Sequence, residues 1–111
     1  MERKIFIDKF FVPANAAEEF VQRMDYNRTF LRKLQGFVSD QAYQQTDENE
    51  NKIFITVAIW ESLDAINKAK EAIQAEYKRI GFNMPDFIQK HDIKMEREIY
   101  EELISDASMK L

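Results

Sequence analysis

The side chains of this sequence that are able to do chemistry are few, and their types narrow the range of functions. The chain has no cysteine, which excludes disulfides, thiol catalysis and cysteine-bound zinc or iron–sulfur centres. It has one histidine, His91, which is too few for a metal site built from several histidines, so we expect no metal. Two further residues stand out: Trp60, the only tryptophan, and Asp8, an acid within an apolar segment.

Each of these three candidates for a functional role also has an ordinary structural explanation. A carboxylate in a central strand is costly to bury unless it is paired, so Asp8 suits a pocket, a salt bridge with a lysine or arginine, or a solvated position. Trp60 suits a core or a dimer interface as well as a pocket. His91 stands at the start of the last predicted strand, where an exposed turn residue is usual.

Hydrophobic patterning predicts four strands that hold or flank these residues. The segment 4–12 is rich in Phe and Ile and ends at a proline. The segments 37–46 and 52–60 flank a short polar break, which is typical of a hairpin. Residues 93–100 alternate between apolar and charged side chains, which predicts a strand with one polar face.

Two helices are predicted from apolar residues that recur at helical spacing. The first covers residues 15–35, with Asn15 and Glu18 forming a start that resembles a capping box. The second follows Ser62, a suitable N-cap, and ends at Gly81. The order βαββαβ predicts a ferredoxin-like α+β domain with an antiparallel four-stranded sheet over residues 1–103, followed by a tail at 104–111.

The two strands expected in the middle of this sheet, 4–12 and 52–60, are apolar on both faces. Side chains alternate between the faces of a strand, so one face is mainly aliphatic and the other mixes aromatic and polar residues. The mixed face carries Phe6, Asp8, Phe10, Val12, Phe54, Thr56, Ala58 and Trp60. Two helices cover only one face, and we expect them on the aliphatic one, provided that no β-bulge shifts the alternation. The mixed face, left uncovered, would then hold a ligand pocket with Phe6, Phe10, Phe54 and Thr56 as binding residues.

Composition and charge exclude several classes of partner. The net charge is −4 and the basic residues form no run, so we expect no nucleic-acid partner. An RNA-recognition module shares the βαββαβ order, but residues 52–59 contain no glycine and lack the basic, aromatic pattern of its motif. No apolar window is long enough for a membrane span and no signal peptide is recognisable, so the expected location is the cytoplasm.

The chain resembles the antibiotic biosynthesis monooxygenase family over about residues 3–100. The resemblance rests on the βαββαβ order, on LQGF at 34–37 and on IWESLDA at 59–65. It implies a homodimer in which two sheets face one another as a dimeric α/β barrel. It argues against haem degradation, because that branch uses an asparagine where this chain has Asp8, and a Trp and a His that its second helix lacks.

The resemblance also implies a chemistry. Members of the family include cofactor-independent oxygenases of phenols and quinols, so we expect no cofactor and a small aromatic ligand. An electron-rich phenolate gives an electron to oxygen directly, while the protein supplies a dry cavity and a group that takes the phenolic proton. Asp8 or His91 would take that proton, and Trp60 and Phe54 would pack the rings. The alternative is a non-catalytic dimeric module of the same fold that binds a small ligand.

Overall fold

The structure, a computed structural model, describes residues 2–103, so the predicted tail at 104–111 lies outside the described residues. Its elements follow in the order β1 (Lys4–Val12), η1 (Ala14–Ala16), α1 (Ala17–Leu31), β2 (Phe37–Thr46), β3 (Lys52–Trp60), α2 (Leu63–Ile80), α3 (Met84–Lys90) and β4 (Lys94–Glu101). The four strands form one antiparallel sheet in the order β2-β3-β1-β4. The ferredoxin-like α+β fold is therefore confirmed, with β1 and β3 in the middle as predicted.

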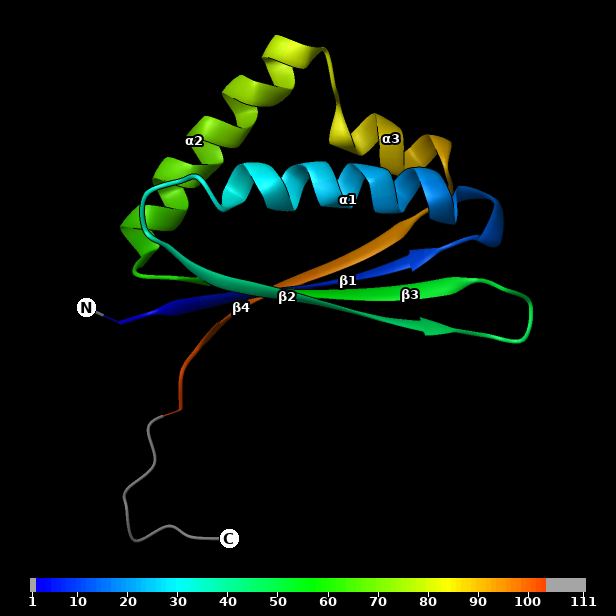
Figure 1. Ribbon diagram of the computed structural model, residues 1–111, viewed down its shortest axis with the longest axis horizontal. Helices are drawn as coiled ribbons and strands as arrows, with labels where there is room; N and C mark the ends of the chain where they lie inside the picture. Colours follow the sequence, from blue (N-terminus) through cyan, green and yellow to red (C-terminus); the bar gives the residue numbers. More distant parts are fainter. Residues whose placement is uncertain (1, 104–111) are drawn as a thin grey trace, which may run out of the picture.

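All the helices lie on one side of the sheet (Figure 1). α1 runs along the sheet, while α2 rises away from it and connects through α3 to β4. None of the helices within residues 2–103 is long and apolar enough to cross a membrane. The other side of the sheet has no covering layer among the described residues.

The start of the first helix differs from the prediction. The chain enters α1 through the 3₁₀ turn η1, and the N-cap residue Ala16 has no side-chain cap, so the capping box expected from Asn15 is wrong. The turn is held by the Ala16 N–H, which donates to the Pro13 carbonyl at 2.9 Å. The Ala14 N–H donates to Asn51 Oδ1 at 3.0 Å, so the β2–β3 hairpin supplies a partner that local sequence does not reveal.

The second helix begins and ends as predicted. The Ser62 hydroxyl accepts a hydrogen bond from the Ala65 N–H at 3.1 Å, which satisfies one of the free donors of the first turn. Gly81 closes α2 in the left-handed conformation at φ 70°.

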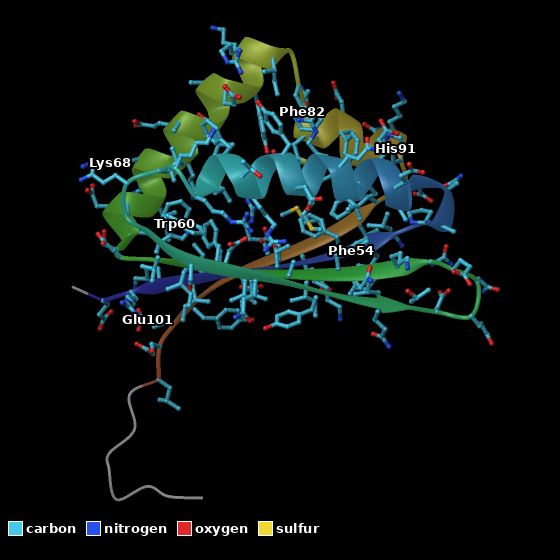
Figure 2. The ribbon with its side chains drawn as sticks, viewed as in Figure 1. Phe54, Trp60, Lys68, Phe82, His91 and Glu101 are labelled. Carbon is cyan, nitrogen blue, oxygen red and sulfur yellow. The ribbon has the colours of Figure 1, made fainter. Side chains whose placement is uncertain are left out.

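The assignment of the two sheet faces was wrong: the mixed face, and not the aliphatic one, lies beneath the helices. Phe10, Val12, Phe54 and Trp60 are buried there, and Phe54 and Trp60 are each only 2% exposed. Figure 2 shows Phe54 and Trp60 pointing from the sheet toward the helices. The residues predicted to line a pocket on an uncovered sheet face therefore lie on the face that the helices cover.

Ring packing explains why the aromatic face receives the helices. Phe20 of α1 stacks on Phe54 with ring centroids 5.0 Å apart and contacts Phe10 at 4.8 Å. Rings of this length reach across the layer between sheet and helix, whereas short branched side chains make a flatter surface. The uncovered face carries the aliphatic residues Ile5, Ile7, Ile53, Ile55, Val57 and Ile59, all half-buried in the single chain.

Candidate active site

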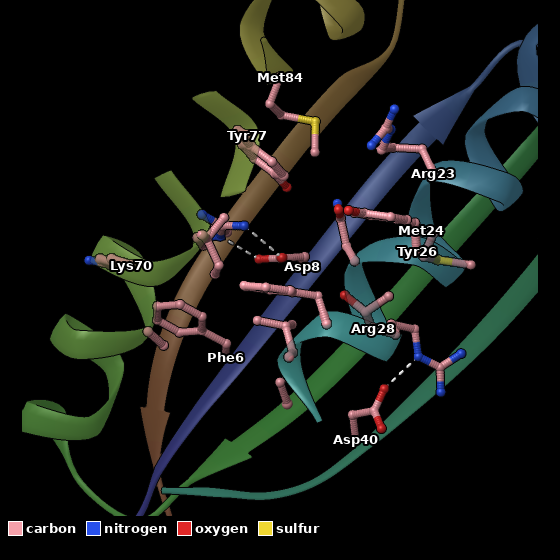
Figure 3. A pocket seen from close by; sticks show the side chains of 18 of the residues that line it. Phe6, Asp8, Arg23, Met24, Tyr26, Arg28, Asp40, Lys70, Tyr77 and Met84 are labelled. Atoms are coloured by element: carbon pink, nitrogen blue, oxygen red, sulfur yellow. Dashed lines mark hydrogen bonds and ion pairs between the residues drawn. The ribbon is translucent and has the colours of Figure 1, made fainter. Parts of the chain in front are cut away.

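A cavity of about 370 Å³ lies between the sheet, α1 and α2. Its apolar wall is made by Phe6, Phe10 and Trp60 from the sheet, Phe20 and Met24 from α1, and Ile66 from α2. The volume falls in the range of sites for small organic molecules, which bury most of a ligand against apolar and aromatic side chains. Figure 3 shows polar side chains reaching into the same space from β1, α1 and α2.

Asp8 is a buried acid on the sheet side of this cavity. Its residue is 9% exposed, and both of its oxygens accept from Arg97 of β4, from Nε at 2.8 Å and from Nη2 at 2.9 Å. The two residues are opposite one another in the β1–β4 register. The carboxylate raises the pKa of Arg97, chiefly through these hydrogen bonds. Asp8 is thus held in the salt bridge that was one of its expected explanations, and it still faces the cavity.

A second ion pair closes the β2 side of the cavity. Asp40 accepts from Arg28 Nε and, at 3.1 Å, from Arg32 Nε. Burial of Asp40 on its own would raise its pKa, but the hydrogen bonds from the two arginines outweigh it and lower the pKa below the usual 3.8. The carboxylate is therefore ionised at neutral pH and is neutralised by its neighbours.

A third group of polar side chains connects α1 to α2 across the cavity. The Tyr26 hydroxyl of α1 donates to Glu76 of α2, and Glu76 also accepts from Arg79 at 2.7 and 2.9 Å. Hydrogen bonds from Arg79 and then from Tyr26 lower the pKa of Glu76 to about 2. This link ties the two helices together on the side of the cavity away from the sheet.

Arg23 of α1 and Tyr77 of α2 line the cavity close to Phe82, which lies in the connection between α2 and α3. The guanidinium of Arg23 lies 3.7 Å from the ring centroid of Phe82, and Tyr77 packs edge-on against the same ring at 5.0 Å. Burial raises the pKa of Tyr77, so its hydroxyl stays protonated and is a hydrogen-bond donor at neutral pH.

The structure brings together most of the residues that the sequence singled out. Asp8, Trp60, Phe6, Phe10 and Thr56 all line the cavity.

The remaining two predicted site residues lie elsewhere. Phe54 belongs to the core cluster beside Phe20 and does not line the cavity. His91 lies beyond α3, packed on Phe87 at 4.6 Å, with Nε2 3.3 Å from Glu19 Oε2 but not in hydrogen-bond geometry (Figure 2). It borders a separate small hollow and does not meet Asp8 or Trp60.

Sequence reasoning missed the polar residues that α1, α2 and β4 contribute. Arg97 had a signal: it interrupts the apolar alternation of Met95 and Ile99, and this is where a cation would be needed opposite Asp8. Arg23 and Tyr77 had none, because their meeting depends on the tilt of α2. Within residues 2–103, no group of three or more His, Cys, Asp and Glu side chains is placed to hold a metal.

Comparison with solved structures places this architecture among known proteins. SnoaB, a cofactor-independent oxygenase from Streptomyces nogalater, is similar with a TM-score of 0.68 and 16% identity, over 99% of this chain and 100% of that one. A candidate antibiotic biosynthesis monooxygenase from Deinococcus radiodurans gives 0.68 and 15%, over 96% and 99%. The chain has the antibiotic biosynthesis monooxygenase fold.

A dimeric ferredoxin-like protein from an uncultured marine organism is also similar, with a TM-score of 0.71 and 7% identity over 96% of this chain and 100% of that one. Comparison with protein-family models and with curated proteins found no match. The resemblance to the antibiotic biosynthesis monooxygenases that the sequence indicated is thus confirmed for the fold.

Proposed function

We propose that this protein is a cofactor-independent monooxygenase that acts on a small aromatic or quinol substrate in the cavity beneath α1 and α2. The observation that supports it most is the cavity itself, which sets one tryptophan, four phenylalanines and a paired carboxylate around a space of about 370 Å³. The fold shared with a cofactor-independent oxygenase supports the same class of reaction.

The reaction balances without an external reductant when the substrate is an anthrone or a similar electron-rich ring. The methylene carbon of an anthrone loses two hydrogens and becomes a carbonyl, one oxygen atom of O₂ enters the product, and the other leaves as water. The ring supplies all four electrons. The protein has to remove one proton to make the electron-rich anion, to hold that anion away from water, and to keep it beside oxygen.

Three cavity residues fit these tasks. Asp8 would accept the proton that the substrate loses, from the methylene carbon of an anthrone or from the hydroxyl of a phenol, because each of its oxygens has a lone pair left beyond the bond to Arg97. Trp60, packed edge-on against Phe37 at 5.3 Å, would hold one face of the rings. Tyr77 would donate to the oxygen on which negative charge develops. His91 has no task in this proposal.

Turnover can be tested by incubating the protein aerobically with anthrones and hydroquinones and measuring product by mass spectrometry. We expect product above the protein-free rate and a loss of at least about tenfold in Asp8→Asn, which keeps the shape but not the charge. Lys68→Gln is the matched control, because Lys68 is exposed on α2 and its one ion-pair partner in the part of the chain that the structure describes is Asp64. Binding of panel members without turnover would instead favour the non-catalytic ligand-binding module.

We further propose that the protein is a homodimer joined through its uncovered aliphatic face, where six Ile and Val side chains gather on β1 and β3. Apolar patches of this kind mark interfaces, and a second copy would bury them. Val57→Lys, at the centre of that face, is expected to give monomers in sedimentation at micromolar concentration. Asn67→Lys adds the same charge on exposed α2 and should leave dimers; a wild-type monomer contradicts the proposal.

A further inference from the structure

The charges around the cavity are not balanced, although the whole chain is acidic. Four cationic and three anionic side chains line it, while the net charge of the protein is −4. Each of the three anions has a partner: Asp8 pairs with Arg97, Asp40 with Arg28, and Glu76 with Arg79. The two cations left over, Arg23 and Lys70, take part in none of the ion pairs within residues 2–103.

Arg23 is held in place by aromatic rings, and no carboxylate among the described residues 2–103 forms an ion pair with it. Its guanidinium stacks 3.7 Å from the centroid of Phe82 and lies 5.4 Å from that of Tyr26. Stacking fixes the plane of the guanidinium and leaves its N–H donors at the edge, where they are able to bind an oxyanion in two-pronged fashion. Lys70, 5.9 Å from the ring of Phe6, lines the opposite side of the cavity (Figure 3).

A neutral aromatic ligand would fit this arrangement poorly. It would strip water from the donors of Arg23 without giving them an acceptor, and a desolvated, unpaired donor opposes binding. An anionic oxygen on the ligand would replace that water with charge-assisted hydrogen bonds. Lys70, exposed on the opposite side, would add a weaker attraction that solvent screens.

We propose that the ligand of this cavity is an aromatic carboxylate, with its rings against Phe6 and Trp60 and its carboxylate bound by Arg23. The inference rests on the proposed use of the cavity as the ligand site, and it names the class of ligand. Oxygenation requires an electron-rich ring, and the carboxylate is a second feature by which the protein would select among such rings.

Trp60 makes binding directly measurable, because it is the only tryptophan and lines the cavity. Energy transfer from its fluorescence to anthracene-9-carboxylate is compared with transfer to 9-hydroxymethylanthracene, a neutral ligand of nearly the same shape. One hydrogen-bonded charge pair corresponds to about a tenfold or larger difference in affinity. We expect the carboxylate to bind at least about tenfold more tightly, and its affinity alone to fall as salt is raised.

Substitutions at Arg23, with a control that removes one positive charge elsewhere, test whether Arg23 causes the preference for the carboxylate. We expect Arg23→Gln to reduce the ratio of the two affinities to about one and Arg23→Lys to keep part of it. Lys68→Gln removes the same charge from the exposed side of α2 and should keep the full ratio. If Arg23→Gln does not fold, the ratio of the two affinities in the wild type and its dependence on salt still test the inference.

The inference is overturned by a wild-type ratio below about two, by a preference that survives Arg23→Gln, or by the absence of binding of either anthracene. These results are separate from the oxygenase proposal. If neutral anthrones bind tightly and are oxidised while carboxylates do not bind, the oxygenase proposal stands and the carboxylate inference fails. If the carboxylate binds to the wild type but not to Arg23→Gln, and no substrate is turned over, the carboxylate inference stands and the oxygenase proposal fails.

Discussion

Substituting Asp8 and substituting Arg97 should lower the free energy of unfolding by unequal amounts, although each change breaks the same ion pair. The side chain of Asp8 is 13% exposed, whereas that of Arg97 is 51% exposed. Asp8→Asn leaves a guanidinium that water still reaches, so the loss is that of charge-assisted hydrogen bonds, about 1–2 kcal/mol. Arg97→Met leaves a carboxylate with few routes to water, and an uncompensated buried charge costs about 3 kcal/mol.

Urea unfolding at pH 7 and one protein concentration measures both losses by linear extrapolation. The double variant Asp8→Asn with Arg97→Met should be more stable than Arg97→Met alone, because it removes the stranded charge. Lys68→Met, in an exposed pair, should change the free energy of unfolding by no more than the error of measurement. A loss in Asp8→Asn equal to or larger than that in Arg97→Met, or the absence of rescue, would refute this reasoning.

Three further predictions test the fold and the site. Gly36→Ala should lower the free energy of unfolding by more than about 2 kcal/mol, because φ is 87° and the new Cβ would lie 2.4 Å from that of Ala65. Gly81→Ala, at φ 70° with open space around it, should lower it by about 1 kcal/mol. Equal losses of the two variants in urea unfolding would contradict the steric argument. Folding lowers the pKa of Asp40, so its contribution to stability is complete above about pH 5 and is lost as the pH falls below 3.8. Asp40→Asn should therefore lose less of its free energy of unfolding between pH 5 and pH 3 than the wild type does. The same dependence of the free energy of unfolding on pH in both proteins would count against the pairing. His91→Gln should keep the full rate of turnover in the oxygenation assay, since His91 lies outside the cavity; a large loss would restore its predicted catalytic role.

The fold could be predicted because it depends on signals that lie within each segment. Runs of aromatic and branched residues marked β1 and β3, a polar break marked the β2–β3 hairpin, and alternation marked β4. Ser62 and Gly81 marked both ends of α2 through local geometry that only a few residue types satisfy. The first helix began later than predicted because the chain enters it through the 3₁₀ turn η1, whose Ala14 N–H donates to Asn51, a residue distant in sequence. No local pattern reveals such a partner.

The site was predicted in part, because alternation groups residues by face but does not say which face is covered. Phe6, Asp8, Thr56 and Trp60 were placed together correctly, yet the helices were assigned to the wrong side. Both faces of β1 and β3 are apolar, so hydrophobicity alone cannot choose between them. The choice depends on how Phe20 of α1 packs against Phe10 and Phe54, and that packing exists only in the folded structure.

The most direct test of the account is the fate of molecular oxygen. Purified protein is incubated with an anthrone under ¹⁸O₂, and the mass of the quinone product is measured. The account predicts a protein-dependent product that carries one ¹⁸O atom and a strongly reduced yield in Asp8→Asn. A product rate equal to that without protein, or an oxygen atom derived from water after exchange is controlled, would contradict it.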